Sequence, residues 1–157
     1  MTARIIEAHS GPALHAVRAL FTEYADWLGF SLDFQGFEDE LARLPGEYRP
    51  PRGRLLLARA DGSGVGCVAL RPLEDRSCEM KRLYVAPSAR GRGIGRLLVQ
   101  RVVSLAEEIG YDHMMLDTLS ARMPAAIALY ESVGFERVAA YRHNPFEDAV
   151  YLRLRLT

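Results

Sequence analysis

Arg90-Gly91-Arg92-Gly93-Ile94-Gly95 is the segment that decides the fold of this chain, because it joins an apolar strand-like run to a long amphipathic helix. The strand-like run is Leu83-Tyr84-Val85, and the helix begins near Ile94. Closely spaced glycines let the backbone turn tightly and bring its N–H groups near a bound group. The first helical turn adds unpaired N–H groups and the positive end of the helix dipole. The segment therefore predicts a phosphate or pyrophosphate site, to which Arg90 and Arg92 add cationic side chains.

An ordinary glycine-rich turn with two solvated arginines is the alternative, since short glycine patterns recur by chance. Both common nucleotide motifs fit poorly. A Walker loop ends in Gly-Lys-Ser/Thr, whereas the only lysine of the chain, Lys81, precedes the turn. A Rossmann loop needs Gly-x-Gly-x-x-Gly, and Gly95 comes one position too early for that spacing.

Arg90-x-x-Gly93-x-Gly95, after a strand that ends Val85-Ala86-Pro87, resembles the pyrophosphate-binding signature of the GNAT superfamily, the acetyl-CoA-dependent N-acetyltransferases. A second segment, Leu129-Tyr130-x-x-x-Gly134-Phe135, resembles the helix–turn–strand that packs beside the cofactor in that family. The two motifs stand in the family's order. The chain is identified as a member of the superfamily by this resemblance, which covers most of residues 55–157.

Hydrophobic spacing predicts a layered α/β domain. Its resemblance to the family implies a mixed, largely antiparallel sheet of six to seven strands flanked by about four helices. The same resemblance implies that the strand containing Leu83-Tyr84-Val85 splays from its neighbour, so that its backbone pairs with the pantetheine arm of acetyl-CoA. We expect helices over residues 14–28, 37–44, 94–109 and 124–133, and strands over 4–7, 55–58, 66–70, 78–85, 113–118, 135–140 and 149–156.

Length and composition agree with one enzyme domain over residues 1–157. The 20 basic and 20 acidic residues balance, so no general attraction to nucleic acid or anionic membrane is expected. No apolar run approaches the roughly 18 residues of a membrane span, and no signal-peptide pattern begins the chain. We therefore expect a cytoplasmic protein, and the scarcity of lysine indicates a bacterial source through genomic base composition.

Tyr130 aligns with the tyrosine that acts as general acid in many members of the family, where it protonates the departing thiolate. A phenol with a pKa near 10 is already protonated at neutral pH. The alternative is a core aromatic, because Tyr130 shares a helical face with Ile127 and Met123. Met123 itself departs from the family, which often has Asn there, and a thioether cannot replace the hydrogen bonds of an amide.

Glu79 lies on the strand before the glycine turn and aligns with a glutamate that is the general base in some members. Burial would have to raise its pKa toward neutrality for that role to be efficient. The alternative is a strand carboxylate that pairs with Lys81 or an arginine. Asp117, at the end of the following strand, is a weaker candidate for the base.

The resemblance implies acetyl-CoA as co-substrate and the primary amine of a small molecule as acceptor, with direct transfer in a ternary complex. Cys67 and Cys78 have no histidine at a fixed spacing that would indicate a covalent relay. The histidines are scattered, so no metal site is expected. A protein N-acetyltransferase and a non-catalytic acyl-CoA sensor are the alternative functions.

The acceptor pocket is walled by the N-terminal helices and the last strands in this family. Acidic residues there could attract a cationic amine, although a solvated surface explains them equally well. Homodimers are common in the family, and the last strand is a candidate interface, but no residue decides the oligomeric state. The candidate wall residues are Trp27, Phe34, Tyr48, Arg49, His143 and Asn144, and the acidic ones are Glu38, Asp39 and Glu40.

Overall fold

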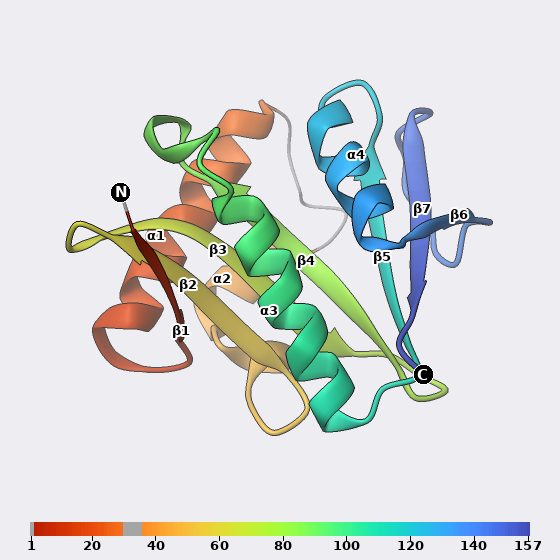
Figure 1. Cartoon of the computed structure of the whole chain (residues 1–157), viewed down its shortest axis with the longest axis horizontal. Coiled ribbons are helices and arrows are strands. Elements are labelled where there is room, and N and C mark those ends of the chain that lie inside the picture. Colours follow the sequence, from red (N-terminus) through yellow and green to blue (C-terminus); the bar gives the residue numbers. More distant parts are fainter. Residues whose placement is uncertain (1, 30–35) are drawn as a thin grey trace.

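Seven strands form one sheet, in a computed structural model that describes residues 2–29 and 36–157 (Figure 1). The strand order is β1-β2-β3-β4-β5-β7-β6, and β4 with β5 is the one parallel pair among these neighbours. The largely antiparallel mixed sheet expected from the sequence is confirmed. The strands are β1 (Ala3–Glu7), β2 (Arg54–Ala60), β3 (Ser63–Pro72), β4 (Ser77–Val85), β5 (His113–Leu119), β6 (Glu136–Val138) and β7 (Ala149–Arg155).

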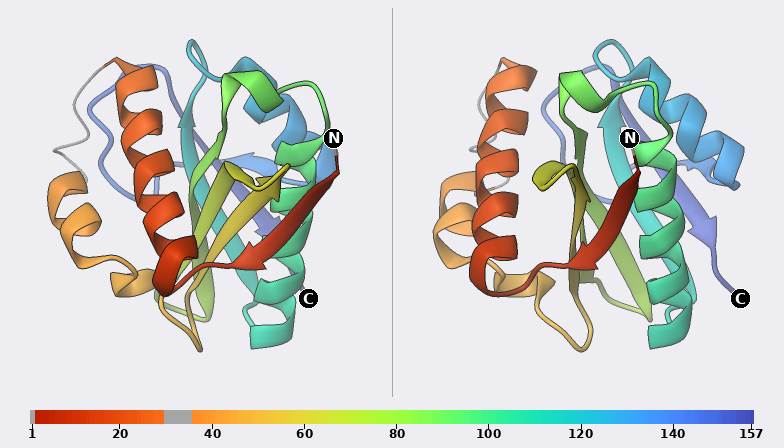
Figure 2. Two further views of the ribbon diagram at one scale, coloured as in Figure 1. Left: turned by 90° about the vertical axis from the view of Figure 1, so that its left-hand side faces the viewer. Right: turned by 60° about the vertical axis from the view of Figure 1, so that its left-hand side comes forward.

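Helices cover both faces of the sheet, with α1 and α2 on one face and α3 and α4 on the other (Figure 2). Alternate residues of a strand point to opposite faces, so the run 55–58 serves two cores. Leu55 and Leu57 pack beneath α1, whereas Leu56 packs beneath α3. The helices are α1 (Gly11–Leu28), α2 (Phe37–Arg43), α3 (Ile94–Ile109) and α4 (Pro124–Val133), with short 3-10 turns at Gly46–Tyr48 and Pro87–Ala89.

The helix ends lie close to the predicted positions. Gly29, Gly110 and Gly134 follow α1, α3 and α4 with φ of 74°, 104° and 117°, a left-handed conformation that costs glycine no steric penalty. The strand predicted over residues 135–140 is shorter than expected. β6 covers only Glu136–Val138, because it pairs with β7 alone at the edge of the sheet.

β4 and β5 separate after a short paired stretch, as the family resemblance implied. Residues 77–79 pair with 113–115, and no ladder pair joins the two strands beyond them. A bulge on β4 bends it at this point, since Arg82 and Leu83 lie between residues that oppose Cys67 and Ala69 of β3. Arg82 has a φ of 62°, which an L residue adopts only under constraint. The bulge opens a gap in the sheet between β4 and β5.

Candidate active site

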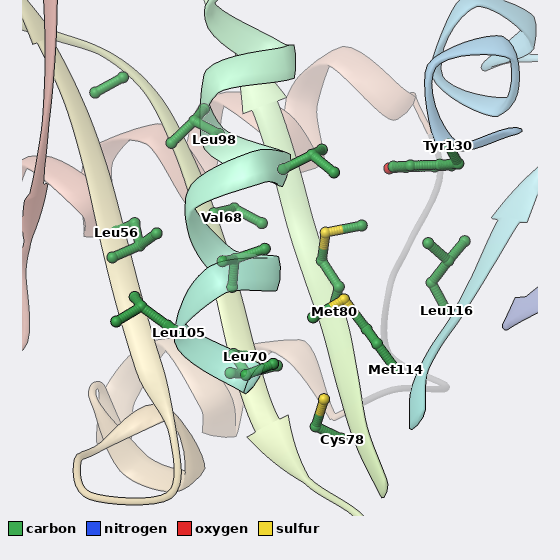
Figure 3. Packing of buried hydrophobic residues seen from close by; sticks show 14 of the residues in the cluster. Leu56, Val68, Leu70, Cys78, Met80, Leu98, Leu105, Met114, Leu116 and Tyr130 are labelled. Atoms are coloured by element: carbon green, nitrogen blue, oxygen red, sulfur yellow. The ribbon is translucent and has the colours of Figure 1, made fainter. Parts of the chain in front are cut away.

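The gap between β4 and β5 holds a cavity of about 50 Å³, here called the strand-gap cavity. Tyr130 reaches it from α4, and its ring extends toward β4 past Leu116 (Figure 3). Met123, at the start of α4, also lines it. The lining residues are Tyr24, Met80, Lys81, Arg82, Leu83, Leu116, Asp117, Thr118, Met123 and Tyr130.

The Tyr130 side chain is buried and packs at 5.8 Å, between ring centroids, against Phe135. Burial raises the pKa of Tyr130 above its ordinary value, so the phenol holds its proton throughout the neutral range. Within the described part of the chain its hydroxyl has no hydrogen-bond partner, although it faces the cavity. The residue predicted as the acid is thus a core aromatic whose protonated hydroxyl faces the gap.

A mostly apolar groove of about 290 Å³, here called the α4 groove, runs between the end of β4 and the start of α4. It shares Leu83 and Met123 with the strand-gap cavity, so the two spaces adjoin at these residues. Five of the lining residues were predicted to bind the cofactor, namely Leu83, Tyr84, Val85, Arg90 and Gly95. The full lining is Trp27, Leu83, Tyr84, Val85, Arg90, Gly95, Arg122, Met123, Pro124, Ala125, Ala126 and Leu129.

The glycine turn forms the N-terminus of α3 at the end of this groove. Gly91 and Gly93 have φ of 79° and 77°, and a Cβ on either would meet no atom within 4 Å. The turn therefore presents backbone to open space. Arg92 is exposed there, whereas the Ile94 side chain is buried in the core, so only the backbone of Ile94 is available to a ligand.

Arg90 is held in place rather than solvated freely. Its Nε donates a 2.9 Å hydrogen bond to the carbonyl oxygen of Val85. Its guanidinium lies 5.0 Å from the centroid of the Trp27 ring and 5.7 Å from that of Tyr84. Trp27, predicted as a wall of the acceptor pocket, lies instead on the α4 groove. These aromatic contacts orient a cation beside the groove.

A larger cavity of about 740 Å³, here called the rim cavity, lies on the α2 side and shares Lys81 with the strand-gap cavity. Tyr48 and Arg49, two of the predicted acceptor-wall residues, line it. Phe34 lies outside the described residues, and His143 lines none of the three spaces. The full lining is Gly36, Asp39, Glu40, Arg43, Pro45, Gly46, Glu47, Tyr48, Arg49, Arg71, Lys81 and Arg142.

Glu79 is fully buried and engaged by three side chains. Arg71 Nε donates to Glu79 Oε1 at 2.7 Å, and the Tyr141 hydroxyl donates to Oε2 at 2.5 Å. Arg142 Nη2 lies 3.3 Å from Oε2. Although burial alone lowers the pKa of Arg71, the charges and hydrogen bonds of Glu79 and Glu47 together raise it above its ordinary value. Glu79 thus forms ion pairs with two arginines that line the rim cavity. This is the arginine pairing that the sequence offered as the alternative to a catalytic base.

Asp117 lines the strand-gap cavity and is also engaged. Arg142 donates two hydrogen bonds to its carboxylate, at 2.7 and 3.2 Å, and Asn144 donates a third at 3.2 Å. Asn144, predicted to contact the acceptor, therefore supports Asp117. Spacing in the sequence gave no signal for the contributions of Arg71, Tyr141 and Arg142, because these residues meet Glu79 only through strand pairing and a distant loop.

Two further features bear on chemistry and location. Among residues 2–29 and 36–157, no three His, Cys, Asp or Glu side chains gather in a way that could hold a metal ion. Within the same residues, no helix combines the length and apolar character that crossing a bilayer requires.

Known proteins share both the sequence and the fold of this chain. Residues 14–135 match the acetyltransferase (GNAT) family. An uncharacterized N-acetyltransferase of the fission yeast Schizosaccharomyces pombe is 44% identical over 142 residues, which cover 89% of this chain and 86% of that protein. This relative is eukaryotic, so similarity does not support the bacterial source expected from composition.

Solved structures agree with the sequence match. A GNAT acetyltransferase from Staphylococcus aureus superposes with a TM-score of 0.80 at 18% identity, over 99% of this chain and 100% of the other. An acetyltransferase from Salmonella typhimurium, determined with acetyl-CoA, gives a TM-score of 0.74 at 19% identity, over 100% and 95%. The family match and the fold together establish the cofactor. The chain belongs to the acetyltransferase (GNAT) family and is an acetyl-CoA-dependent N-acetyltransferase.

Proposed function

We propose that this enzyme transfers the acetyl group of acetyl-CoA directly to the primary amine of a small molecule. The observation that carries the proposal is that three spaces adjoin one another through shared lining residues. The α4 groove meets the strand-gap cavity at Leu83 and Met123, and that cavity meets the rim cavity at Lys81. The thioester would lie in the gap, with the pantetheine arm along the groove and the acceptor entering from the rim cavity.

The backbone and the glycine turn hold the cofactor in this proposal. The unpaired edge of β4 at Leu83, Tyr84 and Val85 pairs with the pantetheine amides as an added strand would. The backbone from Arg90 to Gly95, including Gly91, Arg92, Gly93 and Ile94, forms the pyrophosphate cradle, because first-turn N–H groups and the helix dipole favour an anion.

Tyr130 is the proposed general acid. When the amine attacks the thioester carbonyl, the C–S bond breaks and the CoA thiolate leaves with the electron pair. A phenol that is protonated and faces the gap can pass its proton to this sulfur. Because the Tyr130 hydroxyl has no partner among the described residues, no protein hydrogen bond has to break first.

Glu79 stays the proposed proton acceptor for the amine, but its surroundings define how it would act. Two guanidinium groups and a phenol hydroxyl already contact its carboxylate oxygens, so the amine has no direct access to them. Glu79 does not line the strand-gap cavity, so a water or Tyr141 would have to relay the proton. Asp117, paired with Arg142, and bulk water are the other acceptors.

Direct transfer in a ternary complex is supported by the state of the thiols. Cys67 and Cys78 are both fully buried, and burial raises the pKa of Cys78 to about 12 and that of Cys67 further. A thiol in such surroundings is inert as a nucleophile. An acetyl-cysteine intermediate on either residue is therefore not part of the proposal.

The remaining parts of the proposal are a single domain over residues 1–157, a cytoplasmic location and a bacterial source. One continuous sheet through all described strands supports the single domain. A homodimer through β7 is not favoured by any particular contact. A protein N-acetyltransferase would use the same gap, and the choice of acceptor in a turnover assay separates it from the proposed small-molecule enzyme.

Calorimetric titration with acetyl-CoA, followed by a thiol-release assay over amino acids, polyamines, aminoglycosides and short peptides, tests this proposal. We expect binding, and thiol release with a small amine, in step with formation of the acetylated product. Release only with peptides would indicate the protein N-acetyltransferase. Binding without release from any amine would indicate the acyl-CoA sensor and contradict the proposal.

A further inference from the structure

Several ionic groups around the acceptor space are paired with one another. Arg82 donates two 2.9 Å hydrogen bonds to Glu40, and Arg71 bridges Glu79 and Glu47. The carboxylates of Glu40, Glu47 and Glu79 are therefore less suited to a polycation, because each already has a guanidinium partner. The third such guanidinium, that of Arg142, is paired with Asp117.

Lys81 differs from these paired groups. It lines both the strand-gap cavity and the rim cavity, and in the described part of the chain its ammonium has no carboxylate within 4 Å and no hydrogen bond. Burial and the neighbouring charge of Arg82 lower the pKa of Lys81 to about 8, so the group is mostly charged at pH 7. A desolvated ammonium without a partner is costly for the protein to keep.

We propose that the acceptor is an α-amino acid whose carboxylate pairs with Lys81 while its amine enters the strand-gap cavity. This inference rests on the proposed acetyl transfer and names its substrate class. A carboxylate at Lys81 would offset both the desolvation of the ammonium and its repulsion by Arg82.

The position of Lys81 selects an α-amino acid over an amine with a remote carboxylate. Because the residue lies where the two cavities meet, the anion-binding point is directly beside the space for the reacting amine. Only an acceptor whose amine and carboxylate are neighbours matches that spacing. The side chain of the acceptor would extend into the rim cavity, whose 740 Å³ leaves room for it.

The charges near Lys81 fit this assignment. Glu79 lies two positions before it on β4, Glu40 faces it from α2, and Arg142 faces it from the segment before β7. The two glutamates raise the pKa of Lys81, whereas Arg82 and Arg142 lower it. Three acidic residues were candidates for attracting a cationic amine, and none is well placed to bind one. Glu40 is held by Arg82, and Glu38 and Asp39 are exposed.

The experiment compares matched ligands that differ only in the carboxylate. For turnover, each amino acid is paired with its carboxamide, and kcat and KM are measured for the wild type, Lys81→Met, Lys81→Arg and Arg101→Met. Arg101 lies exposed on α3 and lines none of the three cavities, so its substitution removes a remote positive charge as a control.

We expect the wild type to prefer the acid over its amide by at least about tenfold in kcat/KM, the effect of one well-placed charge-assisted contact. Lys81→Met should abolish that preference by raising KM for the acid, and Lys81→Arg should keep most of it. Equal turnover of acid and amide by the wild type would overturn the inference but not the acetyl transfer. If Lys81→Met lowered kcat equally for the acid and the amide, Lys81 would be a proton acceptor. That result would also overturn the inference.

Binding of the product analogues provides a second readout that does not depend on turnover. N-acetyl amino acids and their amides carry no amine, so calorimetry in the presence of CoA reports on the carboxylate alone. We expect the wild type to lose affinity for the acid as the pH rises from 7 to 9.5 and Lys81 is deprotonated, and Lys81→Arg to lose none. An affinity for the acid that is the same as for the amide would contradict the inference, even if no amine were turned over.

Discussion

Arg71 of β3 and Glu79 of β4 lie directly opposite each other in the sheet, and a 2.7 Å hydrogen bond joins Arg71 Nε to Glu79 Oε1. Strand pairing thus fixes a buried carboxylate beneath an arginine that lines the rim cavity. The pair connects the candidate base to the wall of the acceptor site.

Glu79→Gln should lower kcat while acetyl-CoA affinity is retained, because Glu79 lies on the acceptor side of the gap. Removing one charge of a buried pair also leaves two arginines less neutralised, which we expect to cost about 3 kcal/mol in the free energy of unfolding. A pH profile of kcat separates the roles. If the acidic limb of the profile disappears in the variant, Glu79 is a base. If kcat falls equally at every pH, Glu79 is a positioning residue. Unchanged activity would assign the role of proton acceptor to Asp117 or water.

Tyr130→Phe should lower kcat by roughly 10²- to 10⁴-fold, since the thiolate would leave without its proton donor. The change removes only a hydroxyl that has no partner among the described residues, so Tm and the Kd for acetyl-CoA should hardly move. Stopped-assay kinetics measure kcat, and calorimetry measures the Kd for acetyl-CoA and the Tm, on the same preparation of each protein. Full activity in this variant would return Tyr130 to a purely structural role against Phe135.

Gly93→Asp should abolish acetyl-CoA binding, because it places a negative charge at the N-terminus of α3 where the phosphates are expected. The residue has a φ of 77°, so the substitution also strains the backbone by about 1–2 kcal/mol. Gly11→Asp is the matched control, with a φ of 64°, open space around its Cβ and a place at the start of α1. Both variants should lose stability, and only the first should lose binding; normal binding by Gly93→Asp would refute the cradle.

Glu40→Gln should destabilise the fold at neutral pH and remove part of its acid sensitivity. Burial raises the pKa of Glu40, but the hydrogen bonds and charge of Arg82 outweigh this and lower it below the ordinary 4.5. A depressed carboxyl pKa contributes stability that is present above pH 4.5 and is lost as the pH falls through the folded-state value. Urea unfolding should show a loss of about 3 kcal/mol at pH 7 and a flatter profile below pH 4.5 than in the wild type.

Lys81→Met should stabilise the protein at pH 7. The pKa of Lys81 falls from 10.5 to about 8 on folding, so the unfolded chain binds more protons between these values and wild-type stability rises with pH there. The variant should lack this rise, which amounts to roughly 3 kcal/mol from about 1.4 kcal/mol per pKa unit. Denaturant titrations at pH 7 and pH 10.5 measure it, and a destabilised Lys81→Met at pH 7 would show that the ammonium has a partner in the folded protein.

The sequence by itself determined the elements and the cofactor turn of this protein. Apolar spacing located α1 and α3 closely, whereas Pro124 and Gly134 located the start and end of α4. The glycines that end these helices were visible because only glycine adopts their positive φ without cost. Leu83, Val85 and Gly95, which local motifs single out, all line the α4 groove, since the strand, turn and helix that carry them are contiguous in the chain.

Only the tertiary structure decided the environment of the charged groups. Glu79 meets Arg71 through an antiparallel register and meets Tyr141 and Arg142 through a loop more than 60 positions away, and no spacing in the sequence encodes such meetings. Nor does the sequence show that Lys81, beside the bulge at Arg82, lies where two cavities meet. Hydrophobic periodicity is a local property that a sequence displays, whereas the pairing and desolvation of charges depend on which distant segments the fold brings together.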